Sequence, residues 1–283
     1  MKDKTVIITG ANSGMGLASS AELARQGAYV IMACRNKERG QQALEQAKQI
    51  SGSNRLELAI CDLQSLDSVR EFAAWFKERY PVLDVLLNNA GIMSLKRQIT
   101  PHGFEAHMGI NHLGHFLLTS LLMEPLKAAE QGRIVNVSSG AYKIGKIHYE
   151  DITLERGYNA AKAYAQSKLA NILFTKELAR RLASTQVTAN CLHPGAVATS
   201  IGVDRATGFG KSVMAMLRPF FLTPEQGAAT AIYLATSEEV AEQSGQYFYK
   251  KKPQRLSARA DDPEQARKLW VWSEQQVGYK VPL

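Results

Sequence analysis

Seven short runs of β-branched and other apolar residues alternate along this chain with longer segments of helical periodicity. The runs are TVIIT (5–9), YVIMA (29–33), LELAI (56–60), DVLLN (84–88), RIVNV (133–137), VTANCL (187–192) and QYFY (246–249). The helical segments lie near 14–26, 37–50, 66–79, 102–127, 160–184, 225–236 and 262–276. Such alternation is typical of βαβ units, whose strands form a parallel sheet. The sequence therefore predicts an α/β fold with one doubly wound sheet of about seven strands.

Most of the predicted strands are apolar without alternation, as expected where helices cover both faces of a sheet. In folds of this kind, ligands bind at the carboxyl ends of the strands. The residues that follow each strand are therefore the candidates for function.

The first strand is followed by TGANSGMG (9–16), a glycine-rich loop that leads into a helix. In this position Gly10 permits a tight turn, while Gly14 and Gly16 let the backbone and the helix N-terminus approach a pyrophosphate. The loop predicts a dinucleotide site.

The spacing of this loop, Gly-x-x-x-Gly-x-Gly, resembles that of the short-chain dehydrogenase/reductases. Further landmarks of this family follow in order: Asp62 after the third strand, NNAG (88–91), Asn111, NVSS (136–139), YAQSK (164–168) and HPGAVAT (193–199). The insert KIHYEDITLERGYN (146–159), which should line the substrate pocket, and the C-terminal segment are similar to the retinol-dehydrogenase-like branch. The resemblance covers nearly the whole chain. It implies a single Rossmann-type domain over 1–283 and a nicotinamide-dependent oxidoreductase.

The resemblance also implies roles for individual residues. The implied catalytic residues are Ser139, Tyr164, Lys168 and Asn111. The implied cofactor-binding residues are Gly10, Asn12, Ser13, Gly14, Met15, Gly16, Arg35, Asn36, Asp62, Leu63, Asn89, Ala90, Gly91, Tyr164, Lys168, Pro194, Gly195, Val197 and Thr199. Asn111 would hold a water in a proton relay, and Lys168 would also bond the cofactor ribose.

The pattern Tyr-x-x-x-Lys occurs twice, as Tyr158 with Lys162 and as Tyr164 with Lys168. Either pair would share one helix face at i, i+4 spacing, provided that both residues lie within a helix. Asn159 is a good N-cap before an alanine-rich run, so the helix is expected to begin after Tyr158. Tyr164 and Lys168 are therefore the predicted pair.

A tyrosine and a serine together suit acid–base chemistry on a carbonyl. A free tyrosine has a pKa near ~10, and a cation within ~4–6 Å lowers such a pKa by roughly 1–3. A tyrosine beside a lysine and an oxidised nicotinamide can then donate a proton to a carbonyl, or accept one from an alcohol. Two serines follow the fifth strand, and the family pattern selects Ser139 over Ser138 as the residue that bonds the substrate oxygen.

The end of the second strand, IMACRN (31–36), bears on the choice of cofactor. Sites selective for NAD place an acidic residue there, about 20 residues on, to bind the ribose 2′-hydroxyl. Cys34 takes that position in this chain, and Arg35 and Asn36 follow. A guanidinium can bond a 2′-phosphate with paired donors. The predicted cofactor is NADP(H), with Arg35 as the main discriminator.

The segment 200–222 becomes rich in Met and Phe toward its end, and in the family this segment covers the substrate. An apolar, adaptable lid suits a lipophilic aldehyde, ketone or alcohol. The same side chains can instead complete the core or an oligomer interface, and that alternative stays open. The main prediction is an NADP(H)-dependent carbonyl reductase or alcohol dehydrogenase.

Two other functions stay open. The run VIMACR (30–35) also resembles the light-dependent protochlorophyllide reductases, which reduce an activated C=C bond, although NNAG and SKLAN (167–171) favour carbonyl chemistry. A non-catalytic NADPH-binding regulator would belong to a different class of protein. Such proteins usually lose the tyrosine or the lysine, and both are present here.

Charge and hydropathy argue against several kinds of partner. The longest apolar stretch, 116–126, is predicted as a buried helix, because it is well short of the ~20 residues of a membrane span. The N-terminus leaves no room for a signal segment or a membrane anchor, so a cytoplasmic location is expected. The net charge of +8 is scattered, and no nucleic-acid partner is predicted. The basic run YKKKPQR (249–255) is predicted as a solvated loop.

Cysteine and histidine usage predicts neither disulfides nor a metal. The three cysteines, at 34, 61 and 191, are far apart and each ends an apolar run. His107, His112 and His115 have helical spacing but no evident Cys or carboxylate partner, so structural roles are expected. By analogy with the family, the helices at 112–126 and 160–184 are expected to form the faces of a homo-oligomer.

Overall fold

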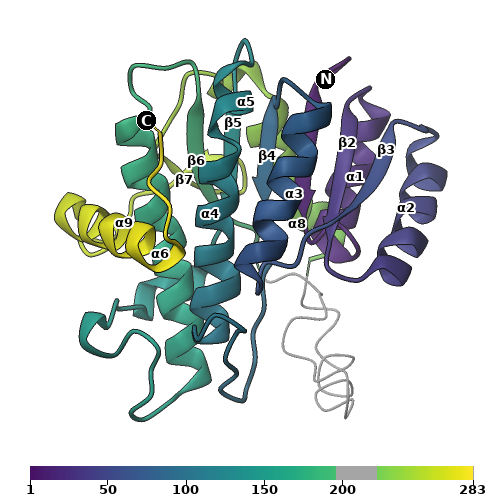
Figure 1. The fold of residues 1–283 in the computed structure, drawn as a ribbon. Coiled ribbons are helices and arrows are strands. Elements are labelled where there is room, and N and C mark those ends of the chain that lie inside the picture. Colours follow the sequence, from purple (N-terminus) through teal and green to yellow (C-terminus); the bar gives the residue numbers. More distant parts are fainter. Residues whose placement is uncertain (196–221, 283) are drawn as a thin grey trace.

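A computed structural model describes residues 1–195 and 222–282. Its centre is one eight-stranded sheet in the order β3-β2-β1-β4-β5-β6-β7-β8 (Figure 1). All neighbouring strands from β3 to β7 pair in parallel, and β8 runs antiparallel to β7. The strands are β1 (Thr5–Thr9), β2 (Tyr29–Cys34), β3 (Leu56–Ile60), β4 (Val85–Asn88), β5 (Arg133–Val137), β6 (Thr188–His193), β7 (Tyr247–Tyr249) and β8 (Lys252–Pro253). The predicted parallel α/β sheet is confirmed, with one more short strand than expected.

Helices cover both faces of this sheet (Figure 1). The α-helices are α1 (Gly14–Arg25), α2 (Lys37–Ser51), α3 (Leu66–Arg79), α4 (Gly114–Leu121), α5 (Met123–Lys127), α6 (Ala160–Arg181), α8 (Pro224–Thr236) and α9 (Pro263–Val277). A π-helix, η1 (His107–Leu113), precedes α4, and short 3-10 helices are η2 (Gly140–Ile144), η3 (Tyr149–Asp151) and η5 (Glu238–Val240). The group α1, α2 and α8 packs on one face, and α3, α4 and α6 lie on the other.

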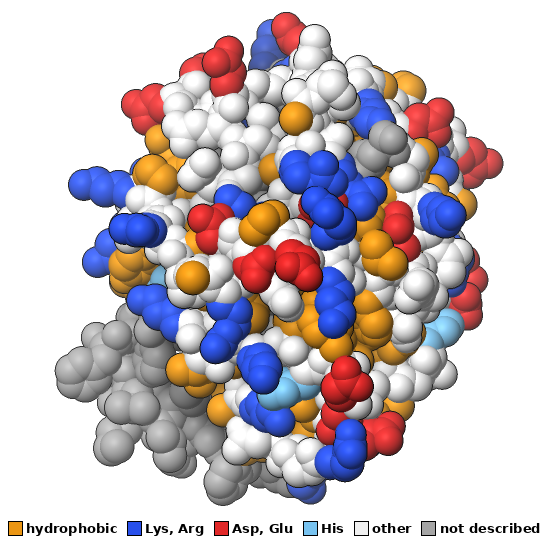
Figure 2. Space-filling model, turned by 90° about the vertical axis from the view of Figure 1, so that its left-hand side faces the viewer, with side chains coloured by type: hydrophobic (Ala, Val, Ile, Leu, Met, Phe, Trp, Pro, Cys, Tyr) orange, Lys and Arg blue, Asp and Glu red, His pale blue; other side chains and the backbone are white. Residues whose placement is uncertain are grey.

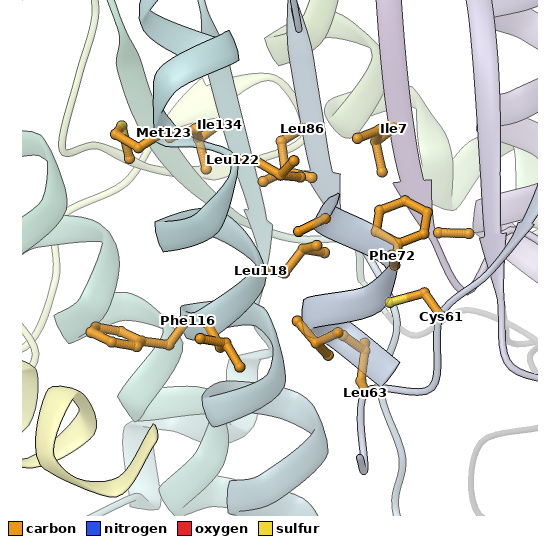
Figure 3. Packing of buried hydrophobic residues seen from close by; sticks show 14 of the residues in the cluster. Ile7, Cys61, Leu63, Phe72, Leu86, Phe116, Leu118, Leu122, Met123 and Ile134 are labelled. Atoms are coloured by element: carbon orange, nitrogen blue, oxygen red, sulfur yellow. The ribbon is translucent and has the colours of Figure 1, made fainter. Parts of the chain in front are cut away.

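Each central strand contributes side chains to two apolar layers, because successive residues of a strand point to opposite faces. In β1, Ile7 lies in one layer, while Val6 and Ile8 lie in the other. Figure 3 shows Ile7 in the layer that also contains Phe72 of α3 and Leu118 of α4. Burial on both faces explains why the predicted strands read as continuous apolar runs.

The single helix predicted over 102–127 is wrong in its extent. The chain turns at Gly103, where φ is 84°, and η1 begins only at His107. A second break, at Leu122, separates α4 from α5. Pro125 explains this break, because it has no N–H to donate to the carbonyl one turn earlier and is tolerated in the first turn of a new helix.

The helix α9 packs against α6 and contacts the buried side of α4. Trp270 of α9 is 1% exposed and packs against Phe116 of α4 and Phe174 of α6, with ring centroids 5.0 and 5.9 Å apart. The Arg181 guanidinium lies 4.4 Å from the centre of the same indole ring. Phe116 of α4 and Phe174 of α6 are thus buried within the chain, and the expectation that these two helices form the faces of a homo-oligomer stays a prediction.

The surface carries mixed charges, as the scattered Lys and Arg of the sequence predicted. On the face shown in Figure 2, basic and acidic side chains alternate with apolar ones and form no single basic patch. The basic run at 249–255 forms an exposed turn at Lys250 and Lys251, then the exposed edge strand β8 in place of a simple loop. Within the described ranges, no helix has the length and apolar character that crossing a membrane requires.

Candidate active site

The carboxyl ends of β1, β4 and β5 lie along the lower edge of the sheet in Figure 1. The strand order runs from β1 to β3 in one direction and continues from β1 to β4 in the other, so it reverses between β1 and β4. Open α/β sheets bind ligands at such a switch point. The glycine-rich loop, NNAG and NVSS all leave the sheet at this edge.

The glycine-rich loop and NNAG touch each other through backbone atoms. Gly10 has φ 64°, and a Cβ at this residue would lie 2.9 Å from Cα of Ala90. A Cβ at Gly16 would clash with the Gly10 carbonyl oxygen and lie 2.7 Å from Nδ2 of Asn89. Both positions therefore require glycine, for a positive φ at the first and for a close backbone approach at both.

We expect Gly16→Ala to weaken dinucleotide binding by about 10–100-fold, because relief of an overpacked contact costs about 1–3 kcal/mol and must displace the loop. The measurement is the dissociation constant of NADPH, the form of the cofactor that the sequence predicts, from fluorescence titration. Gly52→Ala is the control, since Gly52 also has a positive φ, 66°, but no atom within 4 Å of the added Cβ. Equal loss of binding in the two variants would contradict the assigned role of Gly16.

The start of α1 presents backbone N–H groups beside this loop. Ser13 is the N-cap, with extended backbone (φ −170°), and its side chain makes no capping hydrogen bond. The first-turn N–H groups, at Gly14, Met15 and Gly16, have no acceptor within the helix. Helix N–H groups and the helix dipole stabilise an anion at such a position. Asn12 is half-buried in the same loop.

A polar contact between β1 and η1–α4, which the sequence did not reveal, holds NNAG in place. The backbone N–H groups of Asn89 and Ala90 donate to Oγ1 of Thr9 at 2.9 and 3.0 Å. The Thr9 hydroxyl meets Nε2 of His115 at 2.9 Å, and Nδ1 of His115 meets the Asn111 carbonyl oxygen at 3.1 Å. Because a carbonyl only accepts, Nδ1 carries the proton and Nε2 accepts from Thr9.

The burial of His115 makes the stability of the fold depend on pH. Burial is the main cause that lowers the pKa of His115 from 6.5 to about 4, against the bond to the Asn111 carbonyl and with help from the Lys168 charge. Between pH 6.5 and about 4, His115 binds a proton in the unfolded chain but stays neutral in the folded chain. The contribution of neutral His115 to the free energy of unfolding is therefore fully present above pH 6.5 and is lost as the pH falls toward 4. We expect His115→Gln to lower the slope of the unfolding free energy against pH by up to ~1.4 kcal/mol per pH unit between pH 4 and 6.5. Urea unfolding at several pH values measures this slope. The half-exposed His102 provides the control, His102→Gln, and an unchanged slope in His115→Gln would refute the assignment.

Residues of α6 bring the predicted Tyr–Lys pair to the same edge. The helix begins at Ala160 with Asn159 as its N-cap, whose side chain accepts from the Lys162 N–H, so the predicted helix start is confirmed. Lys168 is 4% exposed, and its Nζ lies 5.6 Å from the centre of the Tyr164 ring. The same Nζ donates to the Val137 carbonyl oxygen at 3.2 Å, at the end of β5.

Tyr158 lies outside the helix, as predicted, and its hydroxyl points to the loop after β4. It donates to the Ser94 carbonyl oxygen at 3.3 Å. Burial, and then the charge of Glu105, raises the pKa of Tyr158 to about 12, with Arg97 opposing. Its phenol is therefore a poor acid or base at neutral pH.

The two serines after β5 have different surroundings. Ser138 is 2% exposed, and its hydroxyl donates to the Lys168 carbonyl oxygen at 2.7 Å. Ser139 is half-buried, and its Oγ accepts the Ala141 N–H at 3.3 Å, which leaves the hydroxyl proton available for another acceptor. This difference favours Ser139 as the serine that can bond a substrate.

Asn111 connects η1 with both α6 and the loop after β4. Its Oδ1 accepts the Ile92 N–H at 2.8 Å, and its Nδ2 donates to the Ile92 carbonyl oxygen at 3.1 Å and to Oγ of Ser167 at 2.9 Å. Ser167 in turn donates to the Tyr164 carbonyl oxygen at 2.8 Å. A Cβ at Gly91 would lie 3.4 Å from both Oδ1 of Asn111 and Nζ of Lys168, so these groups lie close together.

Basic residues surround the end of β2. Arg35 is exposed directly after the strand, and the side chain of Asn36 caps α2 by accepting the Arg39 N–H at 2.9 Å. Asn36 therefore shapes the helix start, and its carboxamide oxygen is already occupied. Arg39, which no sequence pattern indicated, is exposed in the first turn of α2 and close enough to Cys34 for its charge to act on that thiol. Two guanidinium groups, those of Arg35 and Arg39, therefore lie near the end of β2.

The residues predicted after β3 are held by local contacts. Asp62 accepts hydrogen bonds from the backbone and side-chain N–H groups of Gln64, at 3.2 and 2.8 Å. Leu63 is buried, and its carbonyl lies against Gly114, where a Cβ would have no space. The close approach of α4 to this loop therefore depends on a glycine.

After β6, the described chain ends shortly beyond the strand. His193 stacks on Tyr249 with ring centroids 4.7 Å apart, and its Nδ1 accepts the Gly195 N–H at 3.2 Å. Burial, and then the Lys143 charge, lowers the pKa of His193. Pro194 and Gly195 are half-buried. Val197, Thr199 and all but the last residue of the predicted substrate-covering segment 200–222 lie outside the described residues.

The three histidines of the 107–115 region each have their own hydrogen-bond partners. His112 meets Oγ of Ser273 at 2.8 Å, and burial, then the His115 charge, lowers its pKa to about 3. Contrary to the expectation from the sequence, His107 has a carboxylate partner, Glu105. In the part of the chain that is described, no three His, Cys, Asp or Glu side chains gather as metal ligands. The three cysteines are buried, and burial raises the pKa of the thiols at 34 and 191 to about 12.

Comparison with known proteins agrees with this arrangement. The sequence model of the family described as short chain dehydrogenase matches residues 4–208. Human retinol dehydrogenase 14 is 48% identical over 98% of this chain and 87% of its own length, and human retinol dehydrogenase 13 is 44% identical over 99% and 86%.

Solved structures show the same fold. An uncharacterised protein from Mycobacterium paratuberculosis superposes with a TM-score of 0.81 at 37% identity, covering 100% of this chain and 96% of its own. A short chain dehydrogenase from Shigella flexneri 2a, solved in complex with NADP, has a TM-score of 0.70 at 25% identity, with coverage of 88% and 97%. The chain therefore belongs to the short-chain dehydrogenase/reductase family of oxidoreductases, in its retinol-dehydrogenase-like branch.

Proposed function

We propose that this protein is an NADP(H)-dependent oxidoreductase that interconverts a lipophilic carbonyl compound and its alcohol. The observation that carries the proposal is the buried Lys168, whose ammonium lies 5.6 Å from the Tyr164 ring at the edge where the glycine-rich loop and NNAG meet. An ammonium and a phenol in this arrangement suit proton transfer to an oxygen atom.

The residues at the switch point fit a dinucleotide. Gly10 and Gly16 keep side chains out of the space between the loop and NNAG, and the start of α1 presents N–H groups for a pyrophosphate. Arg35 and Arg39 can each donate charge-assisted hydrogen bonds to a ribose 2′-phosphate, and β2 ends without an acidic residue. The related Shigella protein in complex with NADP supports the choice of NADP(H).

The bound nicotinamide would supply or accept the hydride. Tyr164 would give its phenolic proton to the substrate oxygen during reduction and take one back during oxidation. Lys168 stabilises the negative charge that develops on the phenolic oxygen when the proton leaves. Ser139 would donate its hydroxyl proton to the same substrate oxygen and thereby orient the carbonyl, while Asn111 holds the backbone of Ile92 beside the pair.

The names of the related human proteins support an apolar substrate, since both are retinol dehydrogenases. The decisive experiment is a screen of purified protein with NADPH against aldehydes of increasing chain length, ketones and retinal, with NADPH absorbance as the readout. We expect turnover to increase with the apolar length of the substrate. Tight NADPH binding without turnover on any carbonyl would contradict the proposal and would favour a non-catalytic NADPH-binding protein instead.

A further inference from the structure

A fully buried pair, Glu105 and His107, lies at the start of η1 beside the candidate catalytic tyrosine. Both side chains are 0% exposed, and Oε1 of Glu105 meets Nδ1 of His107 at 2.7 Å. The other carboxylate oxygen accepts the Met108 N–H at 3.1 Å. Burial of a carboxylate costs free energy unless hydrogen bonds satisfy its oxygens, so the fold depends on both of these bonds.

The second nitrogen of the imidazole holds the loop after β4. Nε2 of His107 accepts the Ser94 N–H at 2.9 Å, which requires that the ring proton lie on Nδ1. The Nδ1–H then donates to Glu105, so the carboxylate sets the tautomer that can hold Ser94. Two residues earlier, Ile92 is held at both its N–H and its carbonyl by Asn111. The loop is thus attached to η1 at two points.

The same imidazole supports the ring of Tyr164. The two ring centroids lie 6.2 Å apart with an interplanar angle of 74°, an edge-to-face contact. His107 therefore touches Tyr164 on one side and holds Ser94 on the other. Displacement of the imidazole would affect both the tyrosine and the loop.

We propose that Glu105 and His107 are positioning residues, which fix the loop at Ser94 and support the Tyr164 ring in the orientation needed for proton transfer. This inference rests on the proposed function for its catalytic consequence. Neither side chain would touch the substrate, since both are fully buried. Their effect is on geometry, and they act as a unit because Glu105 determines where the imidazole proton lies.

Glu105→Gln tests the pair with almost no change of shape. A carboxamide has one acceptor and one donor end, whereas the site presents two donors, the Nδ1–H of His107 and the N–H of Met108. If the amide NH₂ faces Met108, two donors oppose each other there. If it faces His107, the ring proton moves to Nε2 and opposes the Ser94 N–H. Either orientation leaves a buried donor unpaired.

We expect Glu105→Gln to lower kcat for the carbonyl substrate by about 10–100-fold, the equivalent of one unpaired buried donor. The NADPH dissociation constant should stay unchanged, because the pair contacts neither the glycine-rich loop nor the end of β2. Backbone amides in 92–98 should exchange hydrogen about tenfold faster. The double variant Glu105→Leu/His107→Phe removes the buried charge and the opposed side-chain donors together, and it leaves the N–H groups of Ser94 and Met108 without their side-chain acceptors. It should show the same kinetic and exchange changes.

Two variants serve as controls. Glu177→Gln changes another buried carboxylate, which pairs with Arg180 and Arg181 at the far end of α6. His112→Phe changes another buried histidine of η1, which contacts α9 through Ser273. Both should lose stability and keep kcat and the exchange rates of 92–98.

Wild-type kcat and wild-type exchange in folded Glu105→Gln or in the double variant would overturn the inference. Faster exchange with unchanged kcat would also overturn it, because the loop would then be held without consequence for the reaction. If the wild-type protein turns over no carbonyl compound, the proposed function fails, and the exchange of 92–98 still decides whether the pair holds the loop.

Discussion

Tyr164→Phe is expected to lower the rate of NADPH-dependent carbonyl reduction by about 10²–10⁴-fold, the range that a positioned acid–base group contributes. Phenylalanine keeps the aromatic ring, and with it the edge-to-face contact to His107. Only the phenolic hydroxyl group is lost. The NADPH dissociation constant and the unfolding free energy should therefore change little. Single-turnover measurements with saturating NADPH give the rate directly.

Tyr158→Phe is the matched control, since it removes the same hydroxyl from the other Tyr-x-x-x-Lys pattern. Tyr158 lies before α6, and its hydroxyl is shared between two long hydrogen bonds, of 3.3 and 3.5 Å, to the carbonyl oxygens of Ser94 and Lys96. We expect its rate to stay within about threefold of the wild type, because a half-exposed hydrogen bond contributes little. A Tyr164→Phe variant that retains more than a tenth of the wild-type rate would show that another group supplies the proton.

The largest expected effect on binding comes from Arg35→Ala/Arg39→Ala. Each guanidinium can make charge-assisted hydrogen bonds worth about 1.5–3 kcal/mol to a 2′-phosphate, so the double variant should bind NADPH about 10²–10⁴-fold more weakly. NADH lacks this phosphate, and its affinity should hold within about threefold. The preference for NADPH should then shrink or reverse, as measured by titration of both cofactors.

Loss of general positive charge has to be separated from loss of these two contacts. Arg55→Ala/Arg79→Ala removes the same charge from exposed residues that pair with Asp3 and Glu78. This control should keep the NADPH affinity near that of the wild type at physiological salt, where screening acts within about 8 Å. Equal losses in the two double variants would remove Arg35 and Arg39 from the recognition of the phosphate.

Local sequence patterns predicted most elements to within about two residues. The strands were found because burial on both faces demands runs such as TVIIT, and α6 was placed because Asn159 caps it. The long helix over 102–127 was mispredicted, since its apolar character continues through the break that Pro125 imposes. The pattern of apolar residues shows which side chains are buried, but it does not show whether the backbone hydrogen bonds of a helix continue without a break.

Contacts between distant segments lay beyond the reach of sequence patterns. The physical reason to prefer Ser139 over Ser138 comes from a tertiary contact. The Ser138 hydroxyl already donates to the backbone carbonyl of Lys168, 30 residues away. The bond between Thr9 and His115 joins residues 106 apart. Glu105 and His107 are close in sequence, yet the pattern did not show that both are fully buried or that they face Tyr164.

The order of elements, the glycine-rich loop and the Tyr–Lys spacing were determined by the sequence alone, because turns, caps and helix faces depend on neighbours within a few residues. The packing of Trp270 of α9 against α4 and α6, the tautomers of His107 and His115 and the second arginine near β2 were decided by the tertiary structure. Each of these depends on which groups meet when the helices pack on the sheet. Which groups meet depends on how the side chains of distant segments fit together, and a pattern of neighbouring residues carries no information on that fit.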